Sequence, residues 1–324
     1  MSSERDVLQR LIAGPVSGDT LAREAGLTRA AMWKRIEALR DAGVDIDAQS
    51  GRGYALRHPV ELLDADAINA ALAADVRASI AKLEIAWSLD STNSELLRRD
   101  TPARGVAVLL AERQTGGRGR RGRSWISPLA AHLYLSVARQ FSGGLSRLGG
   151  LSLVAGVAVA EALHAAGYDD VQLKWPNDLL VSGRKLGGLL VEGGGEHAGP
   201  VRAVIGLGLN VRMPHDAAAT VDQPWIDLAT MGAAAPSRNA VAACVLGHLL
   251  PALEQFDDEG LSPFLARYVR FDALAGREVI VHGAGTQSSG TALGIAADGA
   301  LRVRVRVDGE ERSFHAGEVS VRPR

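Results

Sequence analysis

Residues 114–125 read QTGGRGRRGRSW, with four glycines and four arginines in the eight positions from Gly116 to Arg123. Glycine lets backbone N–H groups approach a ligand closely, and arginine carries a planar, permanent charge suited to carboxylates and phosphates. Because like charges repel one another on a flexible segment, we expect a loop that is mobile when empty and folds over a polyanion. A solvated basic loop and a general nucleic-acid-binding patch are the alternatives.

The loop lacks the signatures of two common nucleotide-binding motifs. No Gly-Lys-Ser/Thr follows the glycines, as a Walker A loop requires. The arginine spacers, and the lack of a helix pattern behind them, also exclude the dinucleotide fingerprint of a Rossmann fold. A nucleotide bound here would therefore need another architecture.

A second polar cluster is predicted where short strands end. Alternating residues before Lys174 and after Asp178 predict two strands joined by a turn, and an apolar strand from Val201 to Leu209 ends at Asn210. Amide and carboxylate oxygens at strand ends suit Mg²⁺, or hydrogen bonds to a sugar or amide. An ordinary turn that caps its own backbone is the alternative. The cluster consists of Lys174, Asn177, Asp178, Lys185 and Asn210.

Composition limits the class of protein. The 324 residues are 47% hydrophobic and 23% charged with a net charge of −1, which indicates a soluble globular protein of two or three domains. Any nucleic-acid binding must therefore come from a local patch. The single cysteine, Cys244, lies in an apolar helical run and predicts a buried structural thiol in a cytoplasmic protein. We expect neither a signal peptide nor a membrane span.

The first 60 residues predict three helices followed by a strand pair. Thr28 caps the third helix, which ends at Gly43, and the strands flank Gly51-Arg52-Gly53 as in the wing of a winged helix-turn-helix domain. Trp33, early in the third helix, either faces DNA or packs. A small helical protein-interaction domain is the alternative. The candidate DNA contacts are Thr28, Arg29, Lys34, Arg35 and Arg52.

From about Leu274 onwards the pattern changes to short alternating strands. Asp298-Gly299 and Asp308-Gly309 predict hairpin turns, and strict alternation from Leu301 to Val307 places valines on one face and arginines on the other. We expect a small β-barrel whose arginine face is solvated, with a nucleic-acid patch as the second interpretation. His282 and His315 have no paired metal ligands nearby and are expected to be structural.

Taken together, five motifs give the chain its resemblance to a known family. They are Asp90-Ser91-Thr92-Asn93, Gln114 with Gly117–Gly122, Lys174-Trp175-Pro176-Asn177-Asp178, Lys185-Leu186-Gly187-Gly188, and Gly206-Leu207-Gly208-Leu209-Asn210. In this order and spacing the chain resembles biotin protein ligases of the bacterial bifunctional type, which also repress the biotin operon. The similarity covers nearly the whole chain.

The resemblance implies an α+β, multidomain fold. A winged helix-turn-helix DNA-binding domain would span residues 1–62. A central mixed α/β catalytic domain of the biotin/lipoate ligase type would span residues 63–272, and a small β-barrel domain residues 273–324.

The resemblance also implies an ATP-dependent, AMP-forming ligase that uses Mg²⁺ with ATP. The biotin carboxylate would attack the α-phosphorus to give biotinyl-5′-AMP and pyrophosphate, and a lysine of the biotin carboxyl carrier protein would then displace AMP. Both first reactants are anions, so positioning and electrostatic stabilisation would carry the catalysis. The adenylate-bound form would be a homodimer that binds the operator DNA of biotin genes.

Residue roles follow from the same resemblance. Arg118, Arg120 and Lys185 would be catalytic, Trp125 would stack on adenine, and Asp178 is the candidate Mg²⁺ contact through ATP. The implied biotin-binding residues are Ser91, Thr92, Asn93, Gln114, Gly117, Arg118, Gly119, Arg120, Lys185, Gly188 and Gly206. The implied ATP-binding residues are Trp125, Lys174, Asn177, Asp178 and Asn210.

Three other functions stay open at this point. The N-terminal domain of a working ligase could have lost its regulatory role, or the chain could be a ligand-sensing transcription factor without catalysis. The presence of Arg118, Arg120, Lys185 and Asp178 together argues against the second. A lipoate-ligase-like specificity is disfavoured because the biotin motifs match throughout.

Overall fold

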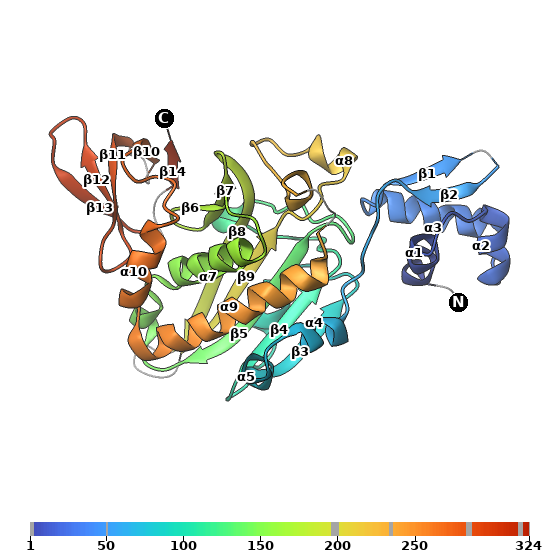
Figure 1. Cartoon of the computed structure of the whole chain (residues 1–324), viewed down its shortest axis with the longest axis horizontal. Helices are drawn as coiled ribbons and strands as arrows, with labels where there is room; N and C mark the ends of the chain where they lie inside the picture. Colours follow the sequence, from blue (N-terminus) through green and yellow to red (C-terminus); the bar gives the residue numbers. More distant parts are fainter. Residues whose placement is uncertain are drawn as a thin grey trace.

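The computed structural model describes residues 3–49, 51–195, 201–232, 236–282, 287–316 and 320–323. An N-terminal helical domain, a central seven-stranded sheet with its helices and a C-terminal five-stranded sheet follow one another along the chain (Figure 1). Over the described ranges, no helix combines the length and apolarity that a bilayer crossing needs.

The N-terminal domain has the predicted three helices and wing. They are α1 (Glu4–Ile12), α2 (Gly18–Glu24), α3 (Arg29–Asp41), β1 (Ile46–Gln49) and β2 (Gly53–Leu56). The Thr28 side chain accepts a hydrogen bond from Ala31 N–H and so caps α3, as expected. Met32 and Ile36 of α3 are fully buried in the domain's own core, which fixes the helix by one face and leaves the other to solvent.

The central sheet has the strand order β3-β4-β5-β9-β8-β7-β6, in which only the β3–β4 pair is parallel. The strands are β3 (Ile80–Ala86), β4 (Val106–Ala111), β5 (Leu133–Phe141), β6 (Gln172–Lys174), β7 (Asp178–Val181), β8 (Arg184–Gly195) and β9 (Val201–Leu209). The strands predicted around Lys174, Asp178 and Asn210 are therefore confirmed. Because β6 to β9 are neighbours, the polar residues at their ends are brought close together.

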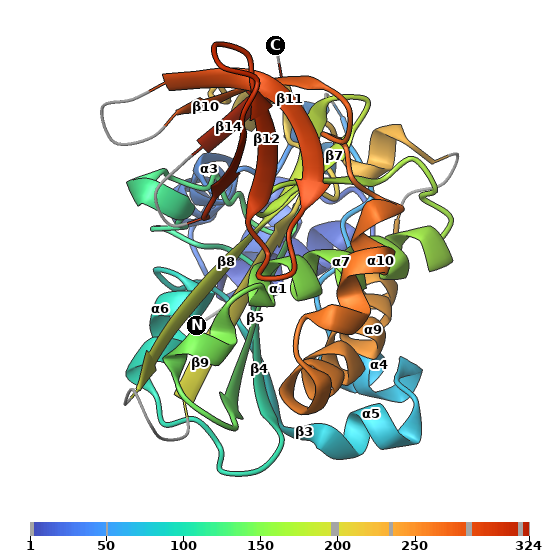
Figure 2. The ribbon, with the colours of Figure 1, turned by 90° about the vertical axis from the view of Figure 1, so that its left-hand side faces the viewer.

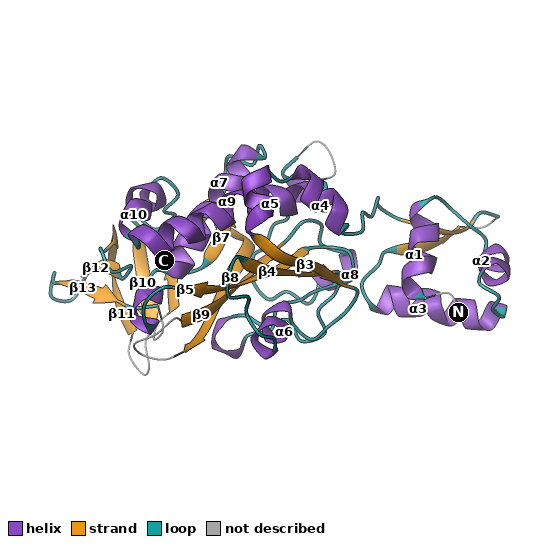
Figure 3. Cartoon of the chain, turned by 90° about the horizontal axis from the view of Figure 1, so that it is seen from below, coloured by secondary structure: helices purple, strands orange, loops and turns teal. Residues whose placement is uncertain are grey.

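The helices divide unequally between the two faces of this sheet (Figure 3). One face is covered by α4 (Ala65–Ala71), α5 (Ala74–Ser79), α7 (Leu151–Ala165) and α9 (Arg238–Glu259), and α10 (Ser262–Val269) packs against α7. Helix α6 (Thr92–Arg98) lies on the other face. Shorter helical turns are η1 (Arg120–Gly122), η2 (Leu145–Leu148), α8 (His215–Ala218) and η3 (Leu228–Thr230). The α6 face is thus left for loops.

Cys244 is half-buried on α9, where its thiol donates to the Ala162 carbonyl at 3.2 Å. Burial raises the pKa of this thiol, which keeps it protonated. The thiol is hydrogen-bonded within the fold, but it is less buried than the sequence predicts.

The C-terminal part is an antiparallel sheet in the order β13-β12-β11-β10-β14, seen above the central domain in Figure 2. Its strands are β10 (Glu278–His282), β11 (Gln287–Ile295), β12 (Leu301–Val305), β13 (Glu311–Phe314) and β14 (Ser320–Pro323). The expected closed barrel is not confirmed, because closure needs the end strands to pair and no β13–β14 pairing occurs among the described residues.

The valine pattern of β12 also ends earlier than expected. Val303 and Val305 are buried, but the strand stops there and Val307 is 91% exposed in the following turn. Gly299 and Gly309 have positive φ, as the predicted Asp-Gly turns require. The buried residues of this sheet continue the core of the central sheet, and Trp175 Nε1 donates to Gly299 O at 3.0 Å across the junction.

A fully buried ion pair joins the start of α9 to the end of β4. Arg238 Nη1 lies 2.7 Å from Glu112 Oε2, and both side chains are only 4% exposed. Glu112 also accepts from Leu63 N–H at 2.6 Å, while Arg238 donates to the His132 carbonyl. The hydrogen-bonding groups of the pair therefore connect segments that are far apart in the sequence.

The His132 ring beside this pair is neutral. Burial, and then the charge of Arg238, lower the pKa of His132 to about 3. Its Nδ1 accepts from Val211 N–H at 3.2 Å, just beyond the end of β9.

We expect Arg238→Met to lower the free energy of unfolding by about 3–5 kcal/mol, because it leaves the Glu112 carboxylate buried without a counter-charge. Adding Glu112→Gln should recover part of the loss, since the amide keeps an acceptor for Leu63. The control is Arg302→Met, which removes an exposed partner of Glu311 and should cost under about 1 kcal/mol. Denaturant unfolding of the four proteins measures this, and equal losses for both arginine variants would contradict it.

Candidate active site

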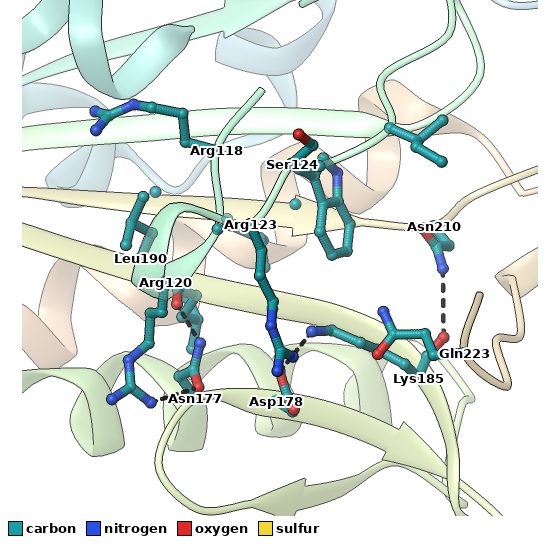
Figure 4. Close-up of a pocket in the computed structure, with 18 of the residues that line it drawn as sticks. Arg118, Arg120, Arg123, Ser124, Asn177, Asp178, Lys185, Leu190, Asn210 and Gln223 are labelled. Atoms are coloured by element: carbon teal, nitrogen blue, oxygen red, sulfur yellow. Dashed lines mark hydrogen bonds and ion pairs between the residues drawn. The ribbon is translucent and has the colours of Figure 1, made fainter. Parts of the chain in front are cut away.

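A cavity of about 820 Å³ lies on the α6 side of the central sheet (Figure 4). It lies between residues 115–126, which we call the glycine–arginine loop, and the ends of β6 to β9. Residues from all five sequence motifs line this one cavity. The predicted residues that line it are Ser91, Thr92, Asn93, Gln114, Arg118, Gly119, Arg120, Trp125, Lys174, Asn177, Asp178, Lys185, Gly188, Gly206 and Asn210. Gly117 is buried behind the wall, where a Cβ would lie 2.5 Å from the Trp125 carbonyl oxygen.

Thr92, Asn93 and Gln114 form the polar floor of the cavity, and the fully buried Ser136 joins Thr92 to Asn93 from behind. Ser136 Oγ donates to Asn93 Oδ1 at 2.6 Å and lies 2.7 Å from Thr92 Oγ1, while Thr92 N–H donates to Gln114 Oε1 at 2.9 Å. Gln114 in turn donates to Ser127 Oγ at 3.2 Å. Ser136 was not predicted, because it lies inside β5 and belongs to no motif.

Ser91 and Gly206 support this floor from two sides. The Ser91 hydroxyl accepts from Ser94 N–H and so caps α6, which fixes the start of the helix that carries Thr92 and Asn93. A Cβ at Gly206 would lie 2.2 Å from Asn93 Oδ1. The lack of a side chain at Gly206, an implied biotin-binding residue, therefore makes room for Asn93.

Two lysines share one carboxylate at the other end of the cavity. Asp178 Oδ1 lies 2.7 Å from Lys185 Nζ, and Oδ2 lies 3.4 Å from Lys174 Nζ. Burial alone would raise the pKa of Asp178, but the two ammonium groups outweigh it and hold the pKa below its usual value. The carboxylate is therefore ionised, and it keeps two positive charges within a few ångströms of each other.

The loop arginines separate into two directions (Figure 4). Arg120 donates to Asn177 Oδ1 at 3.1 Å and to the Ala316 carbonyl of the C-terminal part. Burial lowers the pKa of Arg120, and the negative charge of Asp178 opposes this lowering. Arg118 instead forms a 2.8 Å ion pair with Glu192 and points away from the Lys185–Asp178 pair.

Trp125 forms part of the wall against β9. A Cβ at Gly208 would lie 2.5 Å from Trp125 Cε2, so the glycine is what allows the indole to lie on the strand. Lys185 Nζ is 5.5 Å from the centre of the indole ring. The buried Trp125 Nε1 has no hydrogen-bond partner among the described residues.

Sequence reasoning missed a further wall of the cavity, residues 220–225. Lys185 N–H donates to Pro224 O at 2.9 Å, and Ile226 N–H donates to Lys185 O at 2.9 Å. These bonds bring Trp225 beside Lys185. The segment carries no periodicity or motif that could have predicted this. Arg121, Arg123, Leu190, Met213 and Val321 also line the cavity without having been predicted.

Metal-binding capacity at the site is limited. Within the described ranges, no group of three or more His, Cys, Asp or Glu side chains could hold a metal ion. The cavity-lining carboxylates are Asp178 and Asp222. His315 is exposed with Asp298 4.0 Å away, so it takes no part in the site.

The candidate DNA contacts lie on the N-terminal domain, apart from the cavity (Figure 1). Thr28, Arg29 and Lys34 are exposed at the start of α3, Arg35 is half-buried and Arg52 is exposed in the wing. Trp33 is 53% exposed, so it faces solvent and does not pack into the core.

Comparisons with known proteins match all three parts of the chain. Residues 86–210 match the biotin/lipoate A/B protein ligase family, residues 4–55 an HTH domain, and residues 275–322 the biotin protein ligase C-terminal domain. The bifunctional ligase/repressor BirA of Salmonella typhimurium is 40% identical over 306 residues, which cover 94% of this chain and 93% of that protein. The Escherichia coli protein of the same name is also 40% identical, over 94% of this chain and 92% of its own length.

A solved structure shares the architecture. The biotin protein ligase from Aquifex aeolicus in complex with biotin and ATP aligns with a TM-score of 0.64 and 25% identity, covering 75% of this chain and 100% of that one.

We expect Gly206→Ala to destabilise the protein by about 1–3 kcal/mol, because the added methyl group collides with Asn93 and forces the polar floor to shift. Gly194→Ala is the matched control on the neighbouring strand, since a Cβ there meets nothing within 4 Å. Thermal unfolding measures the difference. Equal melting temperatures for the two variants would contradict the assignment of Gly206 to this close contact.

Proposed function

Because the chain belongs to the biotin protein ligase family, of the bifunctional ligase/repressor type, we propose that it joins biotin to a lysine of a biotin carboxyl carrier protein at the expense of ATP. The observation that carries the proposal is that one cavity combines an uncharged polar floor with a cationic end. A ligand with a neutral head and a carboxylate tail fits that division.

In the first step, the biotin carboxylate attacks the α-phosphorus of ATP and pyrophosphate leaves. Lys174, Lys185 and Arg120 provide positive charge where two anions must meet. This positive charge stabilises the transition state most, because negative charge develops there on the reacting oxygens. Asp178 keeps the two lysines in place before the substrates arrive. Catalysis by positioning and charge needs no covalent nucleophile from the protein.

The polar floor is proposed to bind the ureido and thiophene end of biotin. Ser91 supports the floor as the cap of α6, and the loop from Gly117 to Arg120 closes over the carboxylate. Trp125 offers an aromatic face to adenine, beside the lysine that contacts the phosphates. Gly188, where a Cβ would lie 3.5 Å from Lys185 Cε, leaves space along the lysine side chain.

The donor set fits a magnesium ion that arrives with ATP better than a resident metal. Asp178, Asn177 and Asn210 offer hard oxygen atoms at one end of the cavity, and phosphate oxygens would complete the coordination. Bound there, Mg²⁺ would neutralise charge on the phosphates. Asp178 is suited to this because its pKa is held low by the lysines and it stays ionised.

In the second step, the carrier lysine attacks the acyl carbon and AMP leaves. A mixed anhydride hydrolyses easily, so the loop has a second task in excluding water until the carrier arrives. The contact of Arg120 with Ala316 also brings the C-terminal part to the edge of the site.

The repressor role rests on the N-terminal domain. We place the boundaries of the three domains at residues 1–62, 63–272 and 273–324. Arg29, Lys34 and Arg52 are exposed and would contact DNA phosphates, and two such domains in a homodimer would match two half-sites. Ordering of the loop by biotinyl-5′-AMP would favour that dimer and so make the adenylate a corepressor.

The protein incubated with biotin, ATP, Mg²⁺ and an apo carrier domain should add the mass of one biotinyl group to the carrier, as measured by mass spectrometry.

Lys185→Met should slow adenylate formation by about 10²–10³-fold, because the positive charge that faces the reacting phosphate is lost. Lys82→Met is the control, since Lys82 is exposed on β3 and paired with Glu84. Wild-type adenylation in Lys185→Met, measured in single turnover, would reduce Lys185 to a surface lysine.

Biotin plus ATP should tighten binding of the full-length protein to promoter DNA of biotin genes, and removal of residues 1–62 should abolish it. Affinity for DNA should fall steeply as the salt concentration rises. Lys34→Ala should reduce the slope of log affinity against log salt concentration by about one, because one phosphate contact is lost. Lys82→Ala, a charge loss on β3 of the central sheet, is the control. A gel-shift titration tests this, and DNA affinity indifferent to biotin and ATP would leave only the ligase.

A further inference from the structure

Glu192, on β8, contacts both the glycine–arginine loop and the polar floor. Its Oε2 accepts from Arg118 Nη2 at 2.8 Å and from Asn93 Nδ2 at 2.9 Å. The Glu192 side chain is 25% exposed and that of Arg118 is 42% exposed, so the ion pair is partly shielded from water. Glu192 lies two residues after Leu190 and therefore on the same face of β8, toward the cavity.

These contacts lead back to the base of the loop. Asn93 belongs to the polar floor, whose hydrogen bonds end at Gln114, immediately before the loop. Gln114 donates to Ser127, immediately after the loop. One hydrogen-bonded chain therefore joins both ends of the loop to Arg118 in its middle.

The charge of Glu192 needs such a partner. A carboxylate next to a cavity for two anions repels them unless it is neutralised, and Arg118 neutralises it. The same pairing separates Arg118 from Arg120, whose guanidinium lies on the Asn177 side of the cavity (Figure 4). The loop is thus held at two points with its arginines apart.

We propose that Glu192 is a positioning residue that holds the glycine–arginine loop over the polar floor through Arg118 and so preorganises the biotin subsite. The proposal rests on the ligase function proposed above. Glu192 does not touch the reacting atoms. Holding the loop in place before biotin binds lowers the ordering cost of closing the loop over the ligand.

The first test is Glu192→Gln, which removes the charge that Arg118 needs but keeps an oxygen that accepts from Asn93. The KM for biotin should rise about three- to tenfold, as expected for a partly exposed charge pair, while the KM for ATP and kcat stay within about twofold. Glu161→Gln is the matched control, because Glu161 pairs with Arg267 on the helical face and accepts from its Nε at 2.9 Å. That variant should leave all three constants unchanged.

A second test asks whether Glu192 acts through Arg118. In an Arg118→Gln background, Glu192→Gln should add no further rise in the KM for biotin. Trypsin, which cuts after arginine, should cleave the loop of the ligand-free Glu192→Gln protein faster than that of the wild type or Glu161→Gln.

Two outcomes would overturn the proposal. One is an unchanged KM for biotin in Glu192→Gln with unchanged trypsin cleavage. The other is an equal penalty in the presence and absence of Arg118, which would mean that Glu192 acts through Asn93 alone. A wild-type protein that fails to biotinylate the carrier would instead contradict the ligase function, and the trypsin comparison would still report on the loop.

Discussion

The Asp178 carboxylate allows two lysine ammonium groups to share one end of the cavity, and the rest of the site depends on that arrangement. Without it, Lys174 and Lys185 would repel each other and turn toward solvent. With it, the cavity holds positive charge in advance, at fixed positions, and charge fixed before the reaction stabilises developing anions without reorganisation. The pKa of Asp178 is lowered because the two lysines favour its ionised form, in spite of its burial.

The sheet provides the geometry for this charge. Because α4, α5, α7 and α9 cover one face, the other is open to α6 and the loops (Figure 3). Neighbouring strands then place Asp178 of β7 opposite Gly188 of β8, with Lys185 within reach of both. On the same face, the lack of side chains at Gly206 and Gly208 of β9 leaves room for Asn93 and Trp125 to lie on the strand. The two glycines of the Gly206–Asn210 motif are therefore required by contacts within the protein, before any ligand is considered.

Motifs predicted the parts of the site that local chemistry specifies. Glycine-rich loops, capping residues and Asp-Gly turns carry their own signals, and α3, the wing and the strands around Lys174 and Asn210 are where those signals indicated. Ser136 and Glu192 were missed because each is an ordinary strand residue whose importance comes from which strand lies beside it. The expected barrel failed for the same reason, since alternation specifies strands but not whether the last one meets the first.

The loop that covers the cavity is also covalently continuous with the contact to the DNA-binding domain. Shortly after the loop, Leu129 N–H donates to Ala42 O at 2.8 Å, and Leu129 and Ala130 pack into the core of the N-terminal domain. Ala130 has a φ of 56°, a conformation that costs a residue with a Cβ some energy and persists only where its surroundings enforce it. Trp125, which lines the cavity, lies only a few residues along the chain from this constrained position. The backbone between Trp125 and Ala130 is therefore a direct covalent connection between the cavity wall and the contact with the N-terminal domain.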